Sequence, residues 1–189
     1  MLDTLIQIDQ DLFLWLNNLG TETFDGFWKL ITGKSIWIPL YLFLVFVLFK
    51  KHDWKTASIL LLGGIAAVGF ADLISVHAFK NVFERFRPCH ESEIKEFVRV
   101  VKGCGGKYGF VSSHASNSFA VAMYFYFVFA NKNLKGLWLL PLWAAIVAYS
   151  RIYVGVHYPL DIICGGILGF ILALGSWKLF TNISERINA

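Results

Sequence analysis

Long apolar segments separated by short charged connections constrain this chain more than any other feature of its sequence. The runs at about 36–49, 56–79, 114–130, 134–149 and 160–180 carry very little charge. Segments of this kind satisfy their backbone polar groups as helices, and roughly twenty residues span a bilayer. With 57% hydrophobic residues, 16% charged residues and a mean hydropathy of +0.58, the chain lies outside the soluble globular class. We therefore predict an all-α, polytopic transmembrane helical bundle of about five spans, possibly six.

A chain of 189 residues predicts a single membrane-embedded domain, residues 1–189. Within residues 1–35, apolar side chains recur at helical spacing between acids and amides, which favours helices lying in the membrane interface. No cleavable signal is expected, because the first twenty residues carry acids where a basic region is needed. The formal charge of +4 is too small and too scattered to indicate a nucleic-acid partner, so the expected partners are the bilayer and a lipid.

The connection at residues 80–113 is the only sizeable polar one. Its apolar positions between residues 91 and 102 match an amphipathic helix, although a solvated connector is an equally good interpretation. Asp72, an acid inside an apolar run, should face the bundle interior as a hydrogen-bond partner. Gly165 and Gly169 are four residues apart and allow close contact between helices.

The junction between the last two apolar runs, residues 150–161, concentrates charge. Arg151, His157 and Asp161 lie there, and Pro159 precedes the final run. Because proline is favoured at the first helical position, His157 should lie just before the helix and Asp161 in its first turn. The carboxylate can then reach the imidazole, which suits attack on a phosphate beside a fixed guanidinium. Interfacial Arg and His side chains snorkelling at a helix end explain these residues equally well.

Two further clusters flank the polar connection. Lys80 and Arg87 would share one face about 10 Å apart along the axis if the segment between them is helical. Ser112, Ser113 and His114 directly precede an apolar run, where a serine can cap the helix and free N–H groups can bind an anion. Taken singly, such clusters are more often plain capping or snorkelling. All three clusters, however, fall at helix ends that alternating spans place on one membrane face.

The clusters read Lys80-x6-Arg87-Pro88, then Val111-Ser112-Ser113-His114, then Ser150-Arg151-x5-His157-x3-Asp161. In order and separation they resemble the three-part signature of the type-2 phosphatidic acid phosphatase superfamily, over residues 56 to about 180. Spacing is intact in the first and third parts. The second part departs from the usual Pro-Ser-Gly-His, because Val111 and Ser113 replace proline and glycine. Ser113 affects how closely the backbone can approach a phosphate.

This resemblance implies a metal-independent phosphatase whose catalytic residues are His157, His114 and Asp161. His157 would take the phosphoryl group as phosphohistidine, Asp161 would orient it, and His114 would protonate the leaving oxygen. The remaining signature residues would bind the phosphate oxygens; they are Lys80, Arg87, Ser112, Ser113 and Arg151. Such a set of cations can replace a metal, and the five histidines show no convincing ligand spacing, so we expect no metal and no other cofactor.

The implied substrate is a phosphate monoester or pyrophosphate of a membrane lipid. Among such lipids, undecaprenyl pyrophosphate is the substrate that we favour. Phosphatidylglycerophosphate, phosphatidic acid and lipid A are alternatives, as is transfer of the phosphoryl group to a second lipid. A non-catalytic lipid transporter or scaffold is the alternative from another class. It is disfavoured because a protein that only binds lipid has no reason to keep both His114 and His157.

The side of the membrane that carries these clusters follows from charge and cysteines. When all Lys and Arg residues are counted, ten lie on the face that carries the clusters and seven on the other. Because cytoplasmic loops carry an excess of Lys and Arg, this count would put the site in the cytoplasm. Without residues 80–113, some of whose cations are needed for phosphate, the count is three against seven and favours the periplasmic or extracellular face of an inner membrane. Cys89 and Cys104 can pair in an oxidising compartment, whereas Cys164 should be a buried free thiol.

Overall fold

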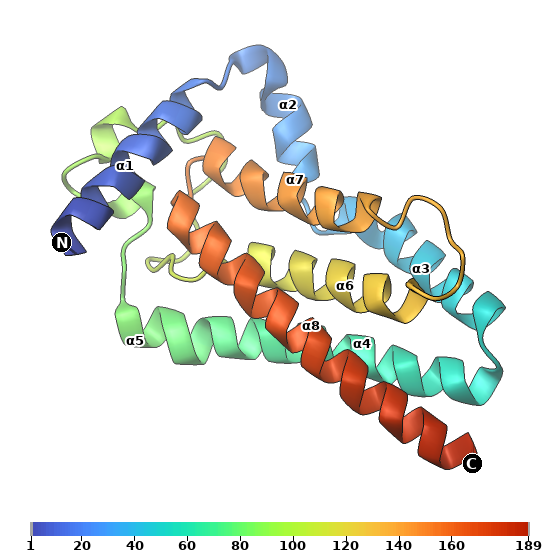
Figure 1. Cartoon of the computed structure of the whole chain (residues 1–189). Coiled ribbons are helices and arrows are strands. Elements are labelled where there is room, and N and C mark those ends of the chain that lie inside the picture. The colour runs from blue at the N-terminus through green and yellow to red at the C-terminus, as the bar shows by residue number, and fades with distance from the viewer. Residues whose placement is uncertain (1, 189) are drawn as a thin grey trace.

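A computed structural model describes residues 2–188 as a helical bundle (Figure 1). Its helices are α1 (Leu2–Asn18), α2 (Glu22–Ile31), α3 (Ile38–Lys51), α4 (Trp54–Ile74), α5 (Asn81–Phe83), α6 (Ser113–Phe129), α7 (Leu139–Tyr153) and α8 (Pro159–Asn188). Short 3-10 turns occupy Ser35–Trp37, Pro88–His90 and Lys95–Phe97, and the π-helical segment Ser75–Lys80 joins α4 to α5. Residues 2–188 contain no β-strand, and the all-α prediction is confirmed.

Two continuous helical stretches are long and apolar enough to cross a membrane. They run from Trp54 to Phe83 and from Pro159 to Asn188, 30 residues each. The pair Glu22–Ile31 and Ser35–Lys51, bent by 63°, is also long and apolar enough if it forms one broken span. Helices α6 and α7 have 17 and 15 residues, fewer than the roughly twenty of a full span. The chain is a membrane protein, and the count of about five spans stays a prediction.

Helix α6 lies at the centre of the bundle and packs against α4, α7 and α8 (Figure 1). Its most extensive contact is with α8, which places small residues against α6. A Cβ atom at Gly165 would lie 2.7 Å from the Ser112 carbonyl oxygen, and one at Gly169 would lie 2.9 Å from the Ala120 nitrogen. The predicted close contact at these two glycines is therefore confirmed. This contact brings the N-termini of α6 and α8 together.

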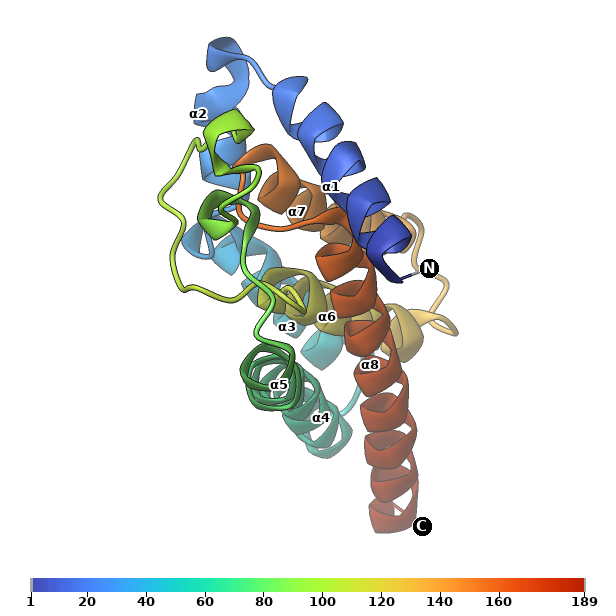
Figure 2. The ribbon, with the colours of Figure 1, turned by 90° about the vertical axis from the view of Figure 1, so that its left-hand side faces the viewer.

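The helix termini that carry the signature residues lie together at one end of the bundle. There, the starts of α6 and α8 and the end of α7 lie beside the polar connection, with α1 and α2 next to them (Figure 2). The α4 stretch reaches this end because it continues as helix through Phe83, beyond its predicted end at residue 79. The helix ends at Glu84, whose left-handed backbone (φ 47°) turns the chain away from the axis.

The amphipathic helix predicted within residues 91–102 does not form, and that interpretation is wrong. Only the single 3-10 turn at Lys95–Phe97 is helical, although the apolar period is present. The backbone groups of this segment are used elsewhere: Arg99 N donates to Asn17 Oδ1 at 2.8 Å, and Val101 N donates to the Val154 carbonyl at 3.3 Å. Because α1 and the end of α7 supply these partners, the segment stays a connector.

Within the N-terminal region, α1 and α2 form where helices were predicted. Their placement in the membrane interface, and the description of the whole chain as one domain, stay predictions. Asp72 is exposed, so its predicted inward orientation is wrong. It is nevertheless a hydrogen-bond partner as predicted, because Asn117 at the start of α6 reaches it and donates from Nδ2 to Asp72 Oδ1 at 3.0 Å.

Candidate active site

His157 and Asp161 form a buried pair at the start of α8. Pro159 opens the helix, so His157 precedes it and Asp161 lies in its first turn, as predicted. His157 Nδ1 lies 3.1 Å from Asp161 Oδ2, and that oxygen also accepts a hydrogen bond from Tyr158 N at 3.1 Å. The two side chains are almost fully enclosed, with His157 1% and Asp161 0% exposed. The carboxylate thus fixes the ring and leaves Nε2 as the nitrogen free to react.

The serine pair holds the start of α6. Ser112 is the N-cap residue, and its Oγ accepts a hydrogen bond from Ala115 N at 3.4 Å. Ser113 Oγ accepts a hydrogen bond from Lys80 Nζ at 2.5 Å and lies 2.7 Å from Ser75 Oγ. The helix therefore begins with free N–H groups beside an ammonium group, which is an anion-binding arrangement.

Three of the predicted residues, Arg87, His114 and Arg151, line one cavity of about 300 Å³. Arg87 is held by its own connection, because Nη1 donates to the Cys104 carbonyl at 2.7 Å and Nε donates to the Tyr108 carbonyl at 3.1 Å. Arg151 Nη1 donates to Thr32 Oγ1 at 2.5 Å, whereas the buried Nε of Arg151 has no hydrogen-bond partner within residues 2–188. A buried donor without a partner beside a cation-lined cavity fits an anionic ligand.

The arrangement agrees with what the chain is similar to. A family model described as the PAP2 superfamily matches residues 57–185. The chain belongs to the PAP2 superfamily. The resemblance that the three clusters indicated is thereby confirmed.

Two PAP2 relatives match almost the whole chain. A lipid A 4'-phosphatase of Porphyromonas gingivalis is 35% identical over 98% of this chain and 78% of its own length. A lipid A 4'-phosphatase of Bacteroides thetaiotaomicron is 34% identical over 100% of this chain and 82% of its own length. With the family, these matches support a phosphatase enzyme that acts on lipids in a membrane.

Solved structures share the fold. A PAP2-type phosphatidylglycerolphosphate phosphatase from Bacillus subtilis superimposes with a TM-score of 0.71 at 21% identity, over 97% of this chain and 88% of that one. Aquifex aeolicus LpxE superimposes with a TM-score of 0.63 at 22% identity, over 89% of this chain and 93% of that one. The bundle is therefore the fold of transmembrane PAP2 proteins.

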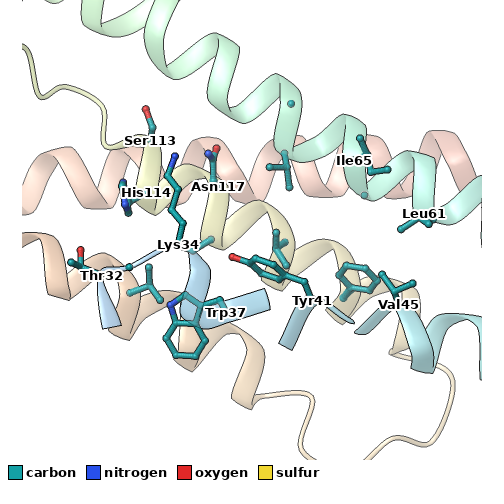
Figure 3. A pocket seen from close by; sticks show the side chains of 18 residues that line it. Thr32, Lys34, Trp37, Tyr41, Val45, Leu61, Ile65, Ser113, His114 and Asn117 are labelled. Carbon is teal, nitrogen blue, oxygen red and sulfur yellow. The ribbon is translucent and has the colours of Figure 1, made fainter. Parts of the chain in front are cut away.

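The PAP2 site continues into an apolar groove of about 590 Å³ between α3, α4 and α6. Thr32, Lys34 and His114 line both the groove and the cation-lined cavity. Figure 3 shows Lys34 extending from the bend before α3 toward Ser113, between His114 and Asn117. Farther along, the groove walls are apolar side chains from the helices. The arrangement can therefore hold a phosphate at one end and an apolar chain along the rest.

The environment also sets the charge of His157, which lies in the loop between α7 and α8. Burial lowers the pKa of His157 well below its ordinary value, and the cations Arg151, Arg87 and Lys80 lower it further. At neutral pH the ring is therefore uncharged in the resting protein. An uncharged ring has the free lone pair that a nucleophile needs.

Cys89 and Cys104 are joined by a disulfide, with Cα atoms 6.1 Å apart, as their positions allowed. Together with His90 they bring potential metal-ligand atoms within 4.8 Å of one another. A disulfide leaves no thiolate to coordinate an ion, so we assign no metal to this cluster. The sequence-based expectation of a metal-free enzyme stays a prediction. Cys164 carries a free thiol as predicted, but it is half-buried and not buried.

The structure brings the predicted residues to one end of the bundle, and it adds others that the sequence analysis missed. Arg85 Nη1 donates to Asp161 Oδ1 at 3.1 Å, and Arg85 Nη2 donates to Asp9 Oδ2 at 2.6 Å. A Cβ atom at Gly109 would lie 2.9 Å from Asp161 Oδ2, so a side chain there would displace the carboxylate. Arg85 lies two residues before Arg87, and that proximity was the one signal in the sequence. Nothing near Asp9 indicated the site.

Proposed function

We propose that this PAP2 protein hydrolyses a phosphate monoester on the headgroup of lipid A or a closely related phosphorylated glycolipid. The observation that carries the proposal is the match of the whole chain to two lipid A 4'-phosphatases. The cavity supports it, because a phosphate bound near His114 would lie at the mouth of an apolar groove. A lipid phosphate needs both environments at once.

In the first step, His157 Nε2 attacks the phosphorus, and the bond between phosphorus and the headgroup oxygen breaks. Asp161 holds the Nδ1 proton and stabilises the positive charge that develops on the ring. His114 gives a proton to the leaving oxygen, which departs as an alcohol. A bound phosphate brings negative charge into the cation-lined cavity, which favours the protonated form of His114 that this donation requires.

In the second step, water attacks the phosphohistidine. His114, now neutral, takes a proton from the water, and the bond between phosphorus and His157 breaks to release inorganic phosphate. Five residues hold the three non-bridging phosphate oxygens through both steps: Lys80, Arg87, Ser112, Ser113 and Arg151. They stabilise the negative charge that these oxygens carry in the transition state. The unpartnered Nε of Arg151 supports its place among them. No step in this scheme needs a metal.

The site belongs, in this proposal, to the periplasmic or extracellular side of an inner membrane. The disulfide between Cys89 and Cys104 supports that side, because it ties the polar connection next to Arg87 and persists only in an oxidising compartment. The charge count without residues 80–113 points the same way. A reagent that reacts with thiols but does not cross membranes tests it after reduction of intact cells.

Undecaprenyl pyrophosphate, preferred from the sequence alone, becomes the second candidate substrate. An undecaprenyl-diphosphatase of Sulfolobus acidocaldarius is 46% identical, but over only 26% of this chain. That match extends over 50 residues, whereas the two lipid A 4'-phosphatases match 98% and 100% of the chain. The two relatives that match nearly the whole chain therefore favour lipid A over the polyprenyl pyrophosphate.

The test is phosphate release by the purified protein in detergent with a chelator present. The substrates are bis-phosphorylated lipid A, phosphatidic acid, phosphatidylglycerophosphate and undecaprenyl pyrophosphate, and mass spectrometry identifies the dephosphorylated lipid. We expect loss of one phosphate from lipid A with the highest kcat/KM of the four. Turnover restricted to undecaprenyl pyrophosphate would overturn the choice of lipid. Transfer of labelled phosphate to a second lipid would replace hydrolysis by phosphotransfer.

A further inference from the structure

Arg85 bridges two buried carboxylates that lie far apart in the sequence. One terminal nitrogen donates to Asp161 Oδ1 at 3.1 Å, and the other donates to Asp9 Oδ2 at 2.6 Å. The Asp9 and Asp161 side chains are 2% and 0% exposed, and that of Arg85 is 22% exposed. A planar guanidinium suits such a bridge, because it offers several donors with fixed directions.

Asp9 also contacts the helix that carries Asp161. Its second oxygen, Oδ1, accepts a hydrogen bond from Leu160 N in the first turn of α8 at 2.9 Å. The first turn of a helix has N–H groups without intrahelical partners, and a carboxylate there is favoured by the helix dipole. Asp9 therefore binds α8 directly and binds Arg85 at the same time.

Aromatic and backbone contacts also hold this group of residues. Arg85 lies over the ring of Tyr158, with 4.0 Å between the guanidinium carbon and the ring centroid. Phe13 of α1 packs edge-on against Tyr158, with centroids 5.4 Å apart, and both side chains are fully buried. The backbone of Arg85 is fixed as well, because Gly109 N donates to its carbonyl at 2.8 Å.

We propose that Asp9 and Arg85 are positioning residues that hold the Asp161 carboxylate against His157, so that helix α1 is part of the machinery of the reaction. In this arrangement Arg85 occupies Asp161 Oδ1 and leaves Oδ2 for His157 Nδ1. Without Arg85, Asp161 can rotate and His157 loses its fixed orientation. The inference rests on the proposed role of His157, but not on the identity of the lipid.

The chain contains a matched ion pair for comparison. Arg99 Nη2 donates to Asp25 Oδ1 at 2.5 Å and joins the same polar connection to α2. The two arginines have similar exposure, 23% for Arg99 and 22% for Arg85, whereas Asp25 is 21% exposed and Asp9 is 2% exposed. Among the contacts of residues 2–188, this pair bonds to Tyr153 and has none to Asp161. It therefore shares the structural role of tying an N-terminal helix to the connection, without any contact to the buried pair His157–Asp161.

The experiment compares Asp9→Asn, Arg85→Gln and Arg85→Lys with Asp25→Asn and Arg99→Gln. The substrate is an activated aryl phosphate, which tests the His157 step without a lipid, and the apparent melting temperature is measured on the same samples. We expect kcat to fall about 10- to 100-fold in Asp9→Asn and Arg85→Gln with KM nearly unchanged, since a small misplacement of reacting groups has effects of this size. Arg85→Lys should recover part of the loss, and the two control variants should keep kcat.

The double variant Asp9→Asn with Arg85→Gln should fall no further than Arg85→Gln alone, because both changes release the same carboxylate. Equal losses of kcat in the Asp9 and Asp25 variants, or losses that follow the melting temperature, would overturn the proposal in favour of a purely structural bridge. If the wild type hydrolyses the aryl phosphate but not lipid A, the proposed substrate fails and this comparison still decides the role of Arg85. A wild type that hydrolyses neither would refute both.

Discussion

Lys80 Nζ donates a hydrogen bond to Ser113 Oγ at 2.5 Å, at the position where the superfamily pattern usually has glycine. The departure from the pattern therefore adds a side chain that holds the Lys80 ammonium group at the start of α6. Ser75 lies 2.7 Å from the same hydroxyl and extends the contact to the π-helical segment. Ser113, which replaces glycine and affects how closely the backbone can approach a phosphate, therefore also ties Lys80 to the start of α6.

Removing that hydroxyl should weaken phosphate binding. In Ser113→Ala, Lys80 loses a charged hydrogen bond, a contact that contributes about 1.5–3 kcal/mol. Part of that free energy orders Lys80 for the ligand. Vanadate resembles a phosphoryl group during transfer and should inhibit competitively, so we expect this inhibition to weaken by about tenfold in Ser113→Ala. Ser58→Ala is the control and should leave the inhibition constant unchanged, because the Ser58 hydroxyl donates to the Trp54 carbonyl at the opposite end of α4. Unchanged or tighter inhibition in Ser113→Ala would mean that Lys80 is placed without Ser113.

The close contact between α6 and α8 should depend on Gly169. A Cβ atom there would meet the backbone of α6, whereas a Cβ atom at Gly175 on the same helix meets nothing within 4 Å. Overpacking of this kind costs about 1–3 kcal/mol, so Gly169→Ala should lower the apparent melting temperature in detergent by several degrees. Gly175→Ala should leave it unchanged or slightly raised, since alanine favours a helix. Equal behaviour of the two variants would contradict the packing.

Stability should depend on pH through His157. Its pKa in the folded protein lies below the ordinary value of 6.5, so the unfolded chain binds the extra proton first as the pH falls. This contribution to stability is therefore complete above about pH 6.5 and is lost below it. The melting temperature of the wild type should fall more steeply between pH 6.5 and 5 than that of His157→Gln. Parallel curves for the two proteins would show that His157 is not held in its neutral form.

The role of His114 should appear in its dependence on the leaving group. A lipid alcohol needs a proton to leave, a pyrophosphate needs it less, and an activated aryl phosphate hardly needs it. General acid catalysis typically contributes ~10²–10⁴-fold, so His114→Ala should lose about that much kcat/KM on a phosphomonoester. The loss should be smaller on a lipid pyrophosphate and nearly absent on the aryl phosphate. An equal loss on all three would mean that His114 binds phosphate without donating a proton.

The sequence predicted those features that depend on neighbours along the chain. Pro159 sets the start of α8, and His157 and Asp161 consequently meet across one helical turn. Gly165 and Gly169 lie on one face of the same helix, so their close contact could also be predicted.

Features that depend on tertiary packing could not be predicted in this way. Arg85 lies 76 residues from both Asp9 and Asp161, and nothing in its local sequence indicates either partner. The apolar period at residues 91–102 is that of a helix, but Asn17 of α1 binds the backbone at Arg99 instead. Interactions with α1 thus decided both outcomes, and the sequence of α1 alone indicated an interfacial helix.

The most direct test of the account is whether His157 carries the phosphoryl group during turnover. The protein is mixed with a ³²P-labelled aryl phosphate, quenched within the first turnover, digested and mapped. We predict an acid-labile, base-stable label on the peptide that contains His157, and no label in His157→Gln. Label on His114, or turnover by His157→Gln at the wild-type rate, would contradict the account.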